Sequence, residues 1–326
     1  MNNRRKLLIA LGAASLTPRM LYAQATQPIL IGWLNAGSRE SGAHLLTALK
    51  EGLAALEWKE GPQFRIEERW GDGQARRLPS LTQELAAQKP ALIVAWGLSV
   101  TVAVAKEAPP IPIVMVSSSD PVAAGVVASL ARPNGMITGV AGFGIELAGK
   151  SLELLLAAAP KIKRIGFLNY AYSATGTRAM EAARRSAIQH SVEPRFADVA
   201  SPKEIEPAIS GLAKDGVRAL VVLPGVLLLT ERRRIVGLAL AQRWPVVGGQ
   251  SEWPAAGALL SYGVDNMANT RRAAYYVDRI LKGAKPGDIS IEQPTTFELV
   301  VNLKTAKALG LTMPPEIMVR ATRVIE

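Results

Sequence analysis

The chain has 326 residues, of which 49% are apolar, and it carries a formal charge of +11 and no cysteine. This length suits two domains that each bury a core. With no cysteine and only two histidines, His44 and His190, we expect no zinc site, and we interpret both histidines as surface or packing residues. The basic residues are scattered rather than clustered with aromatic residues, which argues against nucleic-acid binding.

Residues 1–25 have the pattern of a secretory signal. A basic start, Arg4–Lys6, precedes an apolar run, Leu7–Leu16, that is too short to span a membrane, and Ala23 and Ala25 frame a candidate cleavage site. The adjacent arginines fit a twin-arginine signal, with an ordinary Sec signal as the alternative. Removing the segment leaves a charge of about +7, a weak bias toward anionic ligands. We expect an exported, periplasmic protein with no lipid anchor, since no cysteine is present to carry one.

The first half alternates strand-like apolar runs with helical patterns. Each of four predicted strands is followed by a predicted helix: Ile29–Leu34 and Gly42–Leu56, Phe64–Trp70 and Arg77–Gln88, Ala91–Trp96 and Ser99–Lys106, Ile113–Val116 and Val122–Leu130. Such a β-α series is typical of a parallel sheet covered by helices on both faces.

The second half repeats the first. "IGWLN" at Ile31–Asn35 returns as "IGFLN" at 165–169, "ALIVAWG" at 91–97 returns as "ALVVLPG" at 219–225, and "DPVAAG" at 120–125 returns as "EWPAAG" at 252–257. The offsets are 134, 128 and 132 residues, in chain order. Three ordered matches at nearly one spacing indicate two similar α/β domains.

These patterns predict two Rossmann-like, doubly wound parallel-sheet domains with a hinged cleft between them. We expect the N-terminal domain to comprise residues 28–142 and 265–285, and the C-terminal domain residues 143–264 and 286–326. A helix over Asn266–Lys282, a strand over Thr296–Val301 and a helix from Leu303 then cross back to the first domain and again to the second. Several crossings near one edge form a hinge that closes around a ligand.

Polar residues follow the predicted strands at the edge where doubly wound sheets bind ligands. We expect the two domains to direct these residues into one shared cleft. The candidate ligand-binding residues are Asn35, Gly37, Ser38, Trp96, Gly97, Ser99, Thr101, Ser118, Ser119, Asp120, Asn169, Tyr170, Ser173, Gly225, Gln250 and Glu252.

These residue types form a binding site rather than a catalytic one. Ser99 and Thr101 begin a helix whose free N–H groups attract a carboxylate, and Asp120 and Glu252 could each face a ligand ammonium. Alternatively, Asp120, directly before Pro121, caps the next helix. The sequence has no G-x-S-x-G elbow and no Walker loop, so an exported esterase or glycosidase is disfavoured.

The chain also resembles a known family, the ABC transporter substrate-binding proteins of tryptophan/tyrosine type. The resemblance is carried by residues 48–86, by "IPIVMVSSSDPVAAGVVASLARPNGMITGV" at 111–140, by "ALLSYGVD" at 258–265 and by "RILKGAKPGDISIEQPTTFELVVNLKTAKALGLTMP" at 279–314. It implies a type I periplasmic-binding-protein architecture and a role in transport. The family's cleft loops then correspond to Asn35–Ser38, Gly97–Thr101, Ser117–Asp120, Asn169–Ser173, the loop after Leu223, and Gln250–Glu252.

The sequence departs from the family pattern at Asn169–Ala174, Pro224–Leu229 and Ser251, on the second domain's side of the cleft, and also at Asn134–Met136. The ligand of any one member is therefore not carried over. We expect a monomeric periplasmic solute-binding protein without cofactor or catalytic residues. It would bind an amino acid or related carboxylate and deliver it to an ABC permease. The alternative is an extracytoplasmic ligand sensor that docks on a membrane receptor.

Overall fold

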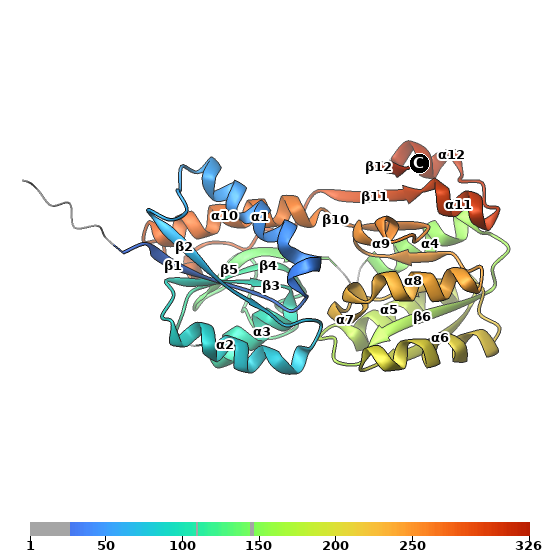
Figure 1. Ribbon diagram of the computed structural model, residues 1–326, viewed down its shortest axis with the longest axis horizontal. Helices are drawn as coiled ribbons and strands as arrows, with labels where there is room; N and C mark the ends of the chain where they lie inside the picture. Colours follow the sequence, from blue (N-terminus) through green and yellow to red (C-terminus); the bar gives the residue numbers. More distant parts are fainter. Residues whose placement is uncertain (1–26, 109, 144–146) are drawn as a thin grey trace, which may run out of the picture.

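The structure, a computed structural model, describes residues 27–108, 110–143 and 147–326. Two α/β units lie side by side, each built on its own sheet with helices on both faces (Figure 1). This arrangement confirms the predicted fold class. The expected signal sequence, residues 1–25, lies outside the described residues. No helix in the described part of the chain is both long and apolar enough to cross a bilayer.

The first sheet has the strand order β2-β1-β3-β4-β5, and all its pairs are parallel. Its strands are β1 (Ile29–Asn35), β2 (Phe64–Trp70), β3 (Leu92–Trp96), β4 (Ile113–Ser119) and β5 (Ile137–Gly142). The helices around it are α1 (Arg39–Ala55), α2 (Leu78–Ala87), α3 (Leu98–Glu107) and α10 (Asn266–Leu281), with short 3-10 turns η1 (Ala75–Arg77) and η3 (Pro286–Asp288).

Side-chain alternation along the strands builds two core layers in this unit. Ile31 and Trp33 of β1 are fully buried beneath α1 and α10, whereas Leu34 faces α2 and α3 on the other side (Figure 1). Because α10 comes from the C-terminal third of the chain, the first core depends on residues distant in sequence. Ala273 and Val277 of α10 are both fully buried in it.

The second sheet has the order β12-β11-β10-β9-β8-β6-β7. Its strands are β6 (Arg164–Tyr170), β7 (Glu193–Val199), β8 (Leu220–Val222), β9 (Val246–Gly248), β10 (Leu260–Val264), β11 (Phe297–Asn302) and β12 (Arg323–Ile325). Strands β7-β6-β8-β9-β10 repeat the order of the first sheet, as two similar domains require. Strand β11 then pairs antiparallel with β10 and extends the sheet.

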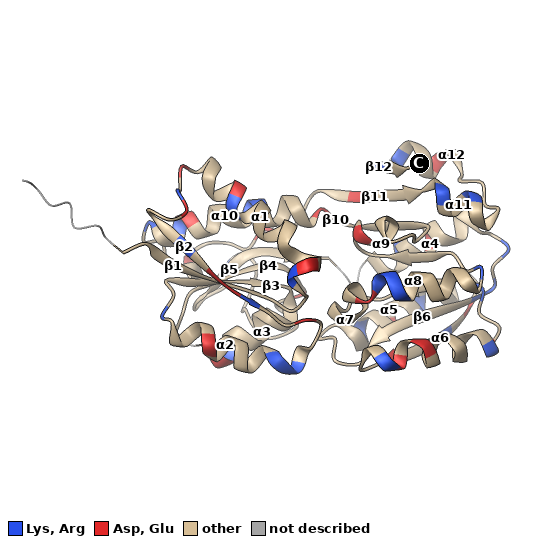
Figure 2. Cartoon of the chain, viewed as in Figure 1, with Lys and Arg blue, Asp and Glu red and all other residues tan. Residues whose placement is uncertain are grey.

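Helices cover the second sheet in the same way as the first (Figure 1). They are α4 (Leu147–Ala158), α5 (Gly176–Gln189), α6 (Ile205–Lys214), α7 (Val226–Thr230), α8 (Arg232–Ala241), α9 (Glu252–Ala255), α11 (Leu303–Leu309) and α12 (Pro315–Arg320), with the 3-10 turn η2 (Pro202–Glu204). Basic and acidic segments are interspersed over both units in the view of Figure 2, where the basic run Arg232–Arg234 begins α8.

The tail crosses between the units twice. Asp265 leads from β10 of the second sheet into α10, and the segment after η3 returns to β11. Before returning, this segment packs on the first sheet: Ile291 is buried among its apolar residues, and the Glu292 carbonyl accepts a hydrogen bond from the Ala141 N–H at 2.8 Å. We therefore propose that the second part of the N-terminal domain extends to residue 292, rather than ending at residue 285 as expected from the sequence.

One predicted helix is wrong. Residues 122–130, expected to be helical, form turns. Asp120 has φ +48° and Gly125 has φ +71°, so the chain leaves the helical region on both sides of a single turn. The Oδ1 atom of Asp120 accepts a hydrogen bond from the Ala123 N–H at 3.2 Å, which is the capping role considered from the sequence, applied to that one turn.

Candidate functional site

A cavity of about 170 Å³ lies between the two units, at the carboxyl ends of the strands of both sheets. Both halves of the repeat supply its walls. The predicted ligand-binding residues that line it are Asn35, Gly37, Trp96, Gly97, Ser99 and Ser119 from the first half, and Tyr170, Ser173, Gly225, Gln250 and Glu252 from the second. The strand-end pattern thus locates most of the polar wall.

The other predicted residues lie outside the cavity, and each has a different partner. Ser38 caps α1 through the Ser41 N–H at 3.2 Å. Thr101 and Ser118 are fully buried and hydrogen bonded to each other at 2.7 Å. Asn169 donates to Asp198 Oδ1 at 2.7 Å, within its own domain. Asp120 pairs with Arg178 of the second domain.

The serines of strand β4 lie in two different environments, the cavity wall and the buried core, because the strand carries a β-bulge. The register of β4 with β5 shifts between Val116 and Ser118, and Ser117 in the bulge has φ +51°. Ser117 and Ser119 therefore reach the cavity while Ser118 is buried beside Thr101. The run of serines after the apolar strand is thus part cavity wall and part buried hydrogen bonding.

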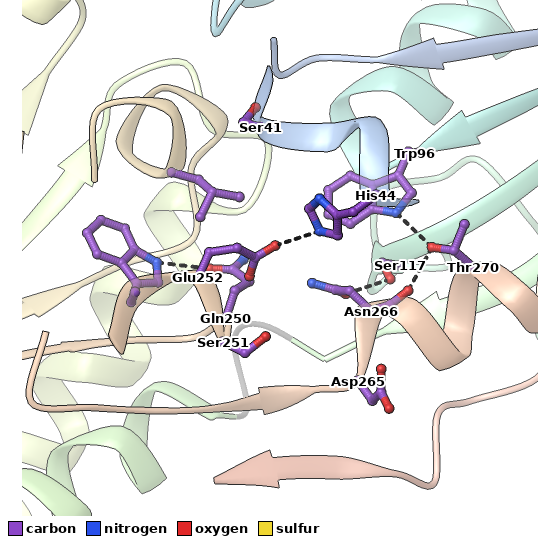
Figure 3. Close-up of polar contacts among 12 residues, drawn as sticks. Ser41, His44, Trp96, Ser117, Gln250, Ser251, Glu252, Asp265, Asn266 and Thr270 are labelled. Atoms are coloured by element: carbon purple, nitrogen blue, oxygen red, sulfur yellow. Dashed lines mark hydrogen bonds and ion pairs between the residues drawn. The ribbon is translucent and has the colours of Figure 1, made fainter. Parts of the chain in front are cut away.

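The N-terminus of α10 adds a polar group that the sequence analysis missed. Asn266 lines the cavity, and its Oδ1 atom accepts a hydrogen bond from the Ser117 hydroxyl at 3.0 Å (Figure 3). The Asn266 carbonyl accepts from Thr270 at 2.7 Å, and Thr270 in turn lies 3.3 Å from Trp96 Nε1. This network fixes the crossing helix against the ends of β3 and β4. The predicted helix began at Asn266, but nothing in the local sequence placed that end in the cleft.

Glu252 is the one charged side chain on the cavity wall in the described part of the chain. Its side chain is 17% exposed, and its Oε1 atom lies 3.3 Å from His44 Nε2 across the cleft (Figure 3). Burial alone raises the pKa of Glu252. The hydrogen bonds from His44 and from its own backbone N–H, and the positive charge of Arg232, outweigh burial and hold that pKa below its usual value. The wall therefore presents an anion at neutral pH.

Apolar and aromatic side chains form much of the remaining wall. Leu45 comes from the first unit and Phe143 from the segment joining the two units, whereas Leu147, Leu223 and Val226 come from the second unit. Trp253, next to Glu252 in α9, is buried and donates from Nε1 to Gln250 Oε1 at 3.1 Å. It holds Gln250 in place.

The first turn of α3 also faces the cavity. Gly97, Leu98, Ser99 and Val100 all line it. Gly97 has φ +90°, so the chain turns sharply from β3 into the helix. N–H groups in the first turn of a helix have no intrahelical acceptor, and they attract anions such as a carboxylate. No group of three or more His, Cys, Asp or Glu side chains that could hold a metal occurs within the residues described.

Comparison with known proteins decides the family. Residues 38–325 match the model of the ABC transporter substrate binding protein family. The chain belongs to this family.

Relatives of this substrate-binding protein include a tyrosine-binding protein of Clostridioides difficile, 25% identical over 267 residues, or 81% of this chain and 76% of the relative. An ABC domain from Streptococcus pneumonia, solved in complex with L-Trp, has a TM-score of 0.84 at 24% identity and covers 92% of this chain and 100% of its own. The ligand-free, open structure of a substrate binding protein with adhesive properties from Clostridium difficile has a TM-score of 0.65 at 23% identity, covering 91% and 99%.

His44 is a further functional candidate that the sequence analysis missed. We expected a surface or packing residue; His44 is indeed exposed, and the structure also places it opposite Glu252. A signal was present, because the ungapped 134-residue repeat aligns His44 with Arg178, the residue that pairs with Asp120. That signal has meaning only once the partners are known from the tertiary structure.

Proposed function

We propose that this substrate-binding protein is a periplasmic component of an ABC importer that encloses an amino acid or related small carboxylate between its domains and delivers it to a permease. The observation that carries the proposal is the cavity walled by strand ends from both sheets, with one carboxylate at neutral pH. The family match favours this role over a sensor that docks on a receptor.

The wall has groups suited to both ends of an amino acid. Glu252 offers a negative charge to an ammonium group, and the first turn of α3 offers N–H groups to a carboxylate. Apolar and aromatic side chains surround the remaining space. A cavity of about 150 Å³ admits a benzene molecule, so about 170 Å³ suits a ligand with one ring system. The ligands named for the two relatives, tyrosine and L-Trp, support an aromatic amino acid.

We propose the cavity-lining residues, rather than the full set predicted from the sequence, as the ligand contacts. In this proposal no bond is made or broken, and no cofactor takes part. The protein acts as a monomer whose domains close because the ligand has a higher affinity for the closed state. The linking segments after β5, at Asp265 and after residue 292 would act as the hinge.

Calorimetric titration of the protein without residues 1–25 tests this function. L-tryptophan and L-tyrosine are expected to bind. Tryptamine lacks the carboxylate and indole-3-propionate lacks the ammonium group, so both should bind at least tenfold more weakly, because each loses a charge-assisted hydrogen bond of about 1.5–3 kcal/mol. A bound amino acid at about 100 times its Kd adds roughly 2.7 kcal/mol and raises the Tm by a few degrees. Equal affinity for all four compounds would contradict the proposed ligand class.

A further inference from the structure

Two ion pairs join the walls of the cleft. The acid comes from the first unit in one pair and from the second unit in the other. Asp120, after β4 of the first unit, accepts a hydrogen bond from Arg178 on α5 of the second. Glu252, at the start of α9 of the second unit, lies 3.3 Å from His44 on α1 of the first (Figure 3). Each domain therefore contributes one acid and one base to the contact.

The internal repeat relates these two pairs. An offset of 134 residues aligns His44 with Arg178, each near the start of the helix that follows the first strand of its domain. An offset of 132 aligns Asp120 with Glu252, each after the fourth strand. The surrounding structure is repeated as well, because Gly42 lies against the side chain of Asn35 as Gly176 lies against that of Asn169.

Neither pair is explained by core packing. The side chains of Asp120 and Arg178 are 33% and 34% exposed, and that of His44 is 41% exposed. Asp120, Arg178 and His44 are not among the residues that line the cavity. His44 and Glu252 also line a second, more open pocket, together with the charged residues Glu40, Arg232, Glu298 and Arg323.

Reciprocal pairing has a physical consequence. When the walls separate, both pairs break and their four side chains return to water. When they meet in the correct register, each acid faces a base. Like charges would meet if one domain slid past the other, so the arrangement favours one closed geometry. We expect the two pairs to act on the lifetime of the closed state, because both partners of each pair come from different domains and meet only when the walls meet.

We infer that Asp120–Arg178 and His44–Glu252 form a reciprocal pair of latches that sets the lifetime of the closed state, with His44, Asp120 and Arg178 as positioning residues that touch no ligand. This inference rests on the proposed function only in that closure encloses a ligand. The latches themselves join the two domains whether or not the cavity is occupied.

Stopped-flow release of L-tryptophan provides the first test. Arg178→Gln, Asp120→Asn and His44→Gln should each raise the dissociation rate about fivefold and change the association rate by less than about twofold, as expected for a partly exposed ion pair. The double variant D120N/R178Q should release L-tryptophan no faster than either single variant does. The charge exchange D120R/R178D should restore slow release. The conservative variant His44→Arg should keep release as slow as in the unmodified protein.

A matched control is Arg164→Gln, which removes a similarly exposed ion pair to Glu193 within the second domain (2.7 Å) and should leave release unchanged. Additive effects of Asp120→Asn and Arg178→Gln, or an exchange variant no slower than the single variants, would overturn the inference.

A second measurement does not depend on the ligand. The chain has no cysteine, so Gln88→Cys and Lys214→Cys, both at exposed positions, place one dye on each domain for single-molecule FRET. Each latch variant should increase the mean distance in the ligand-free protein and reduce its sensitivity to salt, whereas Arg164→Gln should not. If the latch variants leave the distance between the two dyes unchanged, the inference is wrong even if L-tryptophan binds. Failure of L-tryptophan to bind would count against the proposed function alone.

Discussion

Glu252 combines two properties at the scale of one residue: it is largely buried, and it is ionised. A buried carboxylate is costly unless positive charge and hydrogen bonds compensate, and here His44 and Arg232 supply them. Because it lies both on the cavity wall and in a cross-cleft pair, we propose that Glu252 couples ligand recognition to the approach of the two domains.

Glu252→Gln tests the recognition half of this role. The amide has the same shape but no charge, so affinity for L-tryptophan should fall about tenfold or more, as for loss of a charge-assisted hydrogen bond. Affinity for indole-3-propionate, which lacks the ammonium group, should fall much less. Calorimetry on both compounds separates the two effects of the residue. An equal loss for both would show that Glu252 acts only through the contact with His44.

Glu292 offers a pH-dependent test at the same scale. A hydrogen bond from Arg272 Nε, 2.8 Å from Glu292 Oε2, is the main cause that lowers the pKa of Glu292, against a smaller opposing effect of burial. A carboxyl with a lowered folded-state pKa stabilises the protein above its unfolded pKa of about 4.3. That stability is lost as the pH falls through the folded-state value.

Glu292→Gln should therefore lower the free energy of unfolding more at pH 6 than at pH 3. The loss at pH 6 should stay under about 1 kcal/mol, because the pair is more than one-third exposed and screened by solvent. Urea unfolding at both pH values measures it. A variant equally destabilised at pH 6 and pH 3 would show that the ion pair is not the cause.

At the scale of elements, close backbone approaches shape the sheet edges that surround the site. Gly139 of β5 has φ +132°, and a Cβ atom built there would lie 2.1 Å from the carbonyl oxygen of Met115 on β4. Only glycine fits that position. The same pairing of β4 with β5 carries the bulge at Ser117, so the direction of the cavity serines depends on it.

Gly139→Ala should destabilise the protein by about 3 kcal/mol or more, through backbone strain and a forced shift of β4. Gly211→Ala is a suitable control, because Gly211 lies in helix α6 with nothing within 4 Å of its added Cβ. It should stabilise the protein by up to about 1 kcal/mol. Chemical unfolding of both variants provides the measurement, and a neutral Gly139→Ala would contradict the close approach.

Whole-molecule organisation depends on the tail. Helix α10 packs on α1 and completes the first core, while β11 extends the second sheet. Trp58, from the segment after α1, donates from Nε1 to Asp278 Oδ1 of α10 at 2.9 Å. Neither unit can therefore be obtained by a single cut of the chain, although the repeat makes the two halves look separable.

A chain ending at residue 264 tests this dependence. It lacks Ala273, Ala274, Tyr276 and Val277, which are at most 1% exposed. Burial of a large apolar side chain stabilises a fold by about 1.5–3 kcal/mol. Losing the buried side chains of α10 therefore removes a large part of the stability of a typical domain. We expect no cooperative thermal transition and strong binding of a hydrophobic dye. A sharp transition near the Tm of the full chain would show that the first unit folds without α10.

The sequence by itself determined the alternation of strands and helices, the duplication and the edge of the sheets at which the cavity lies. These follow from local apolar periodicity and from repeats such as Ile31–Asn35 with 165–169, which need no knowledge of distant contacts. Local pattern failed at 122–130, where small apolar residues are compatible with a helix but the positive φ of Asp120 and Gly125 ends it.

Tertiary structure alone decided which strand-end residues face the cavity. The bulge in β4 separates Ser118 from its neighbours, and α10 brings Asn266 to Ser117 from 149 positions further along the chain. It also decided the partners of His44 and Arg178, because an ion pair across a cleft depends on how two domains meet, and no periodicity within either domain encodes that meeting.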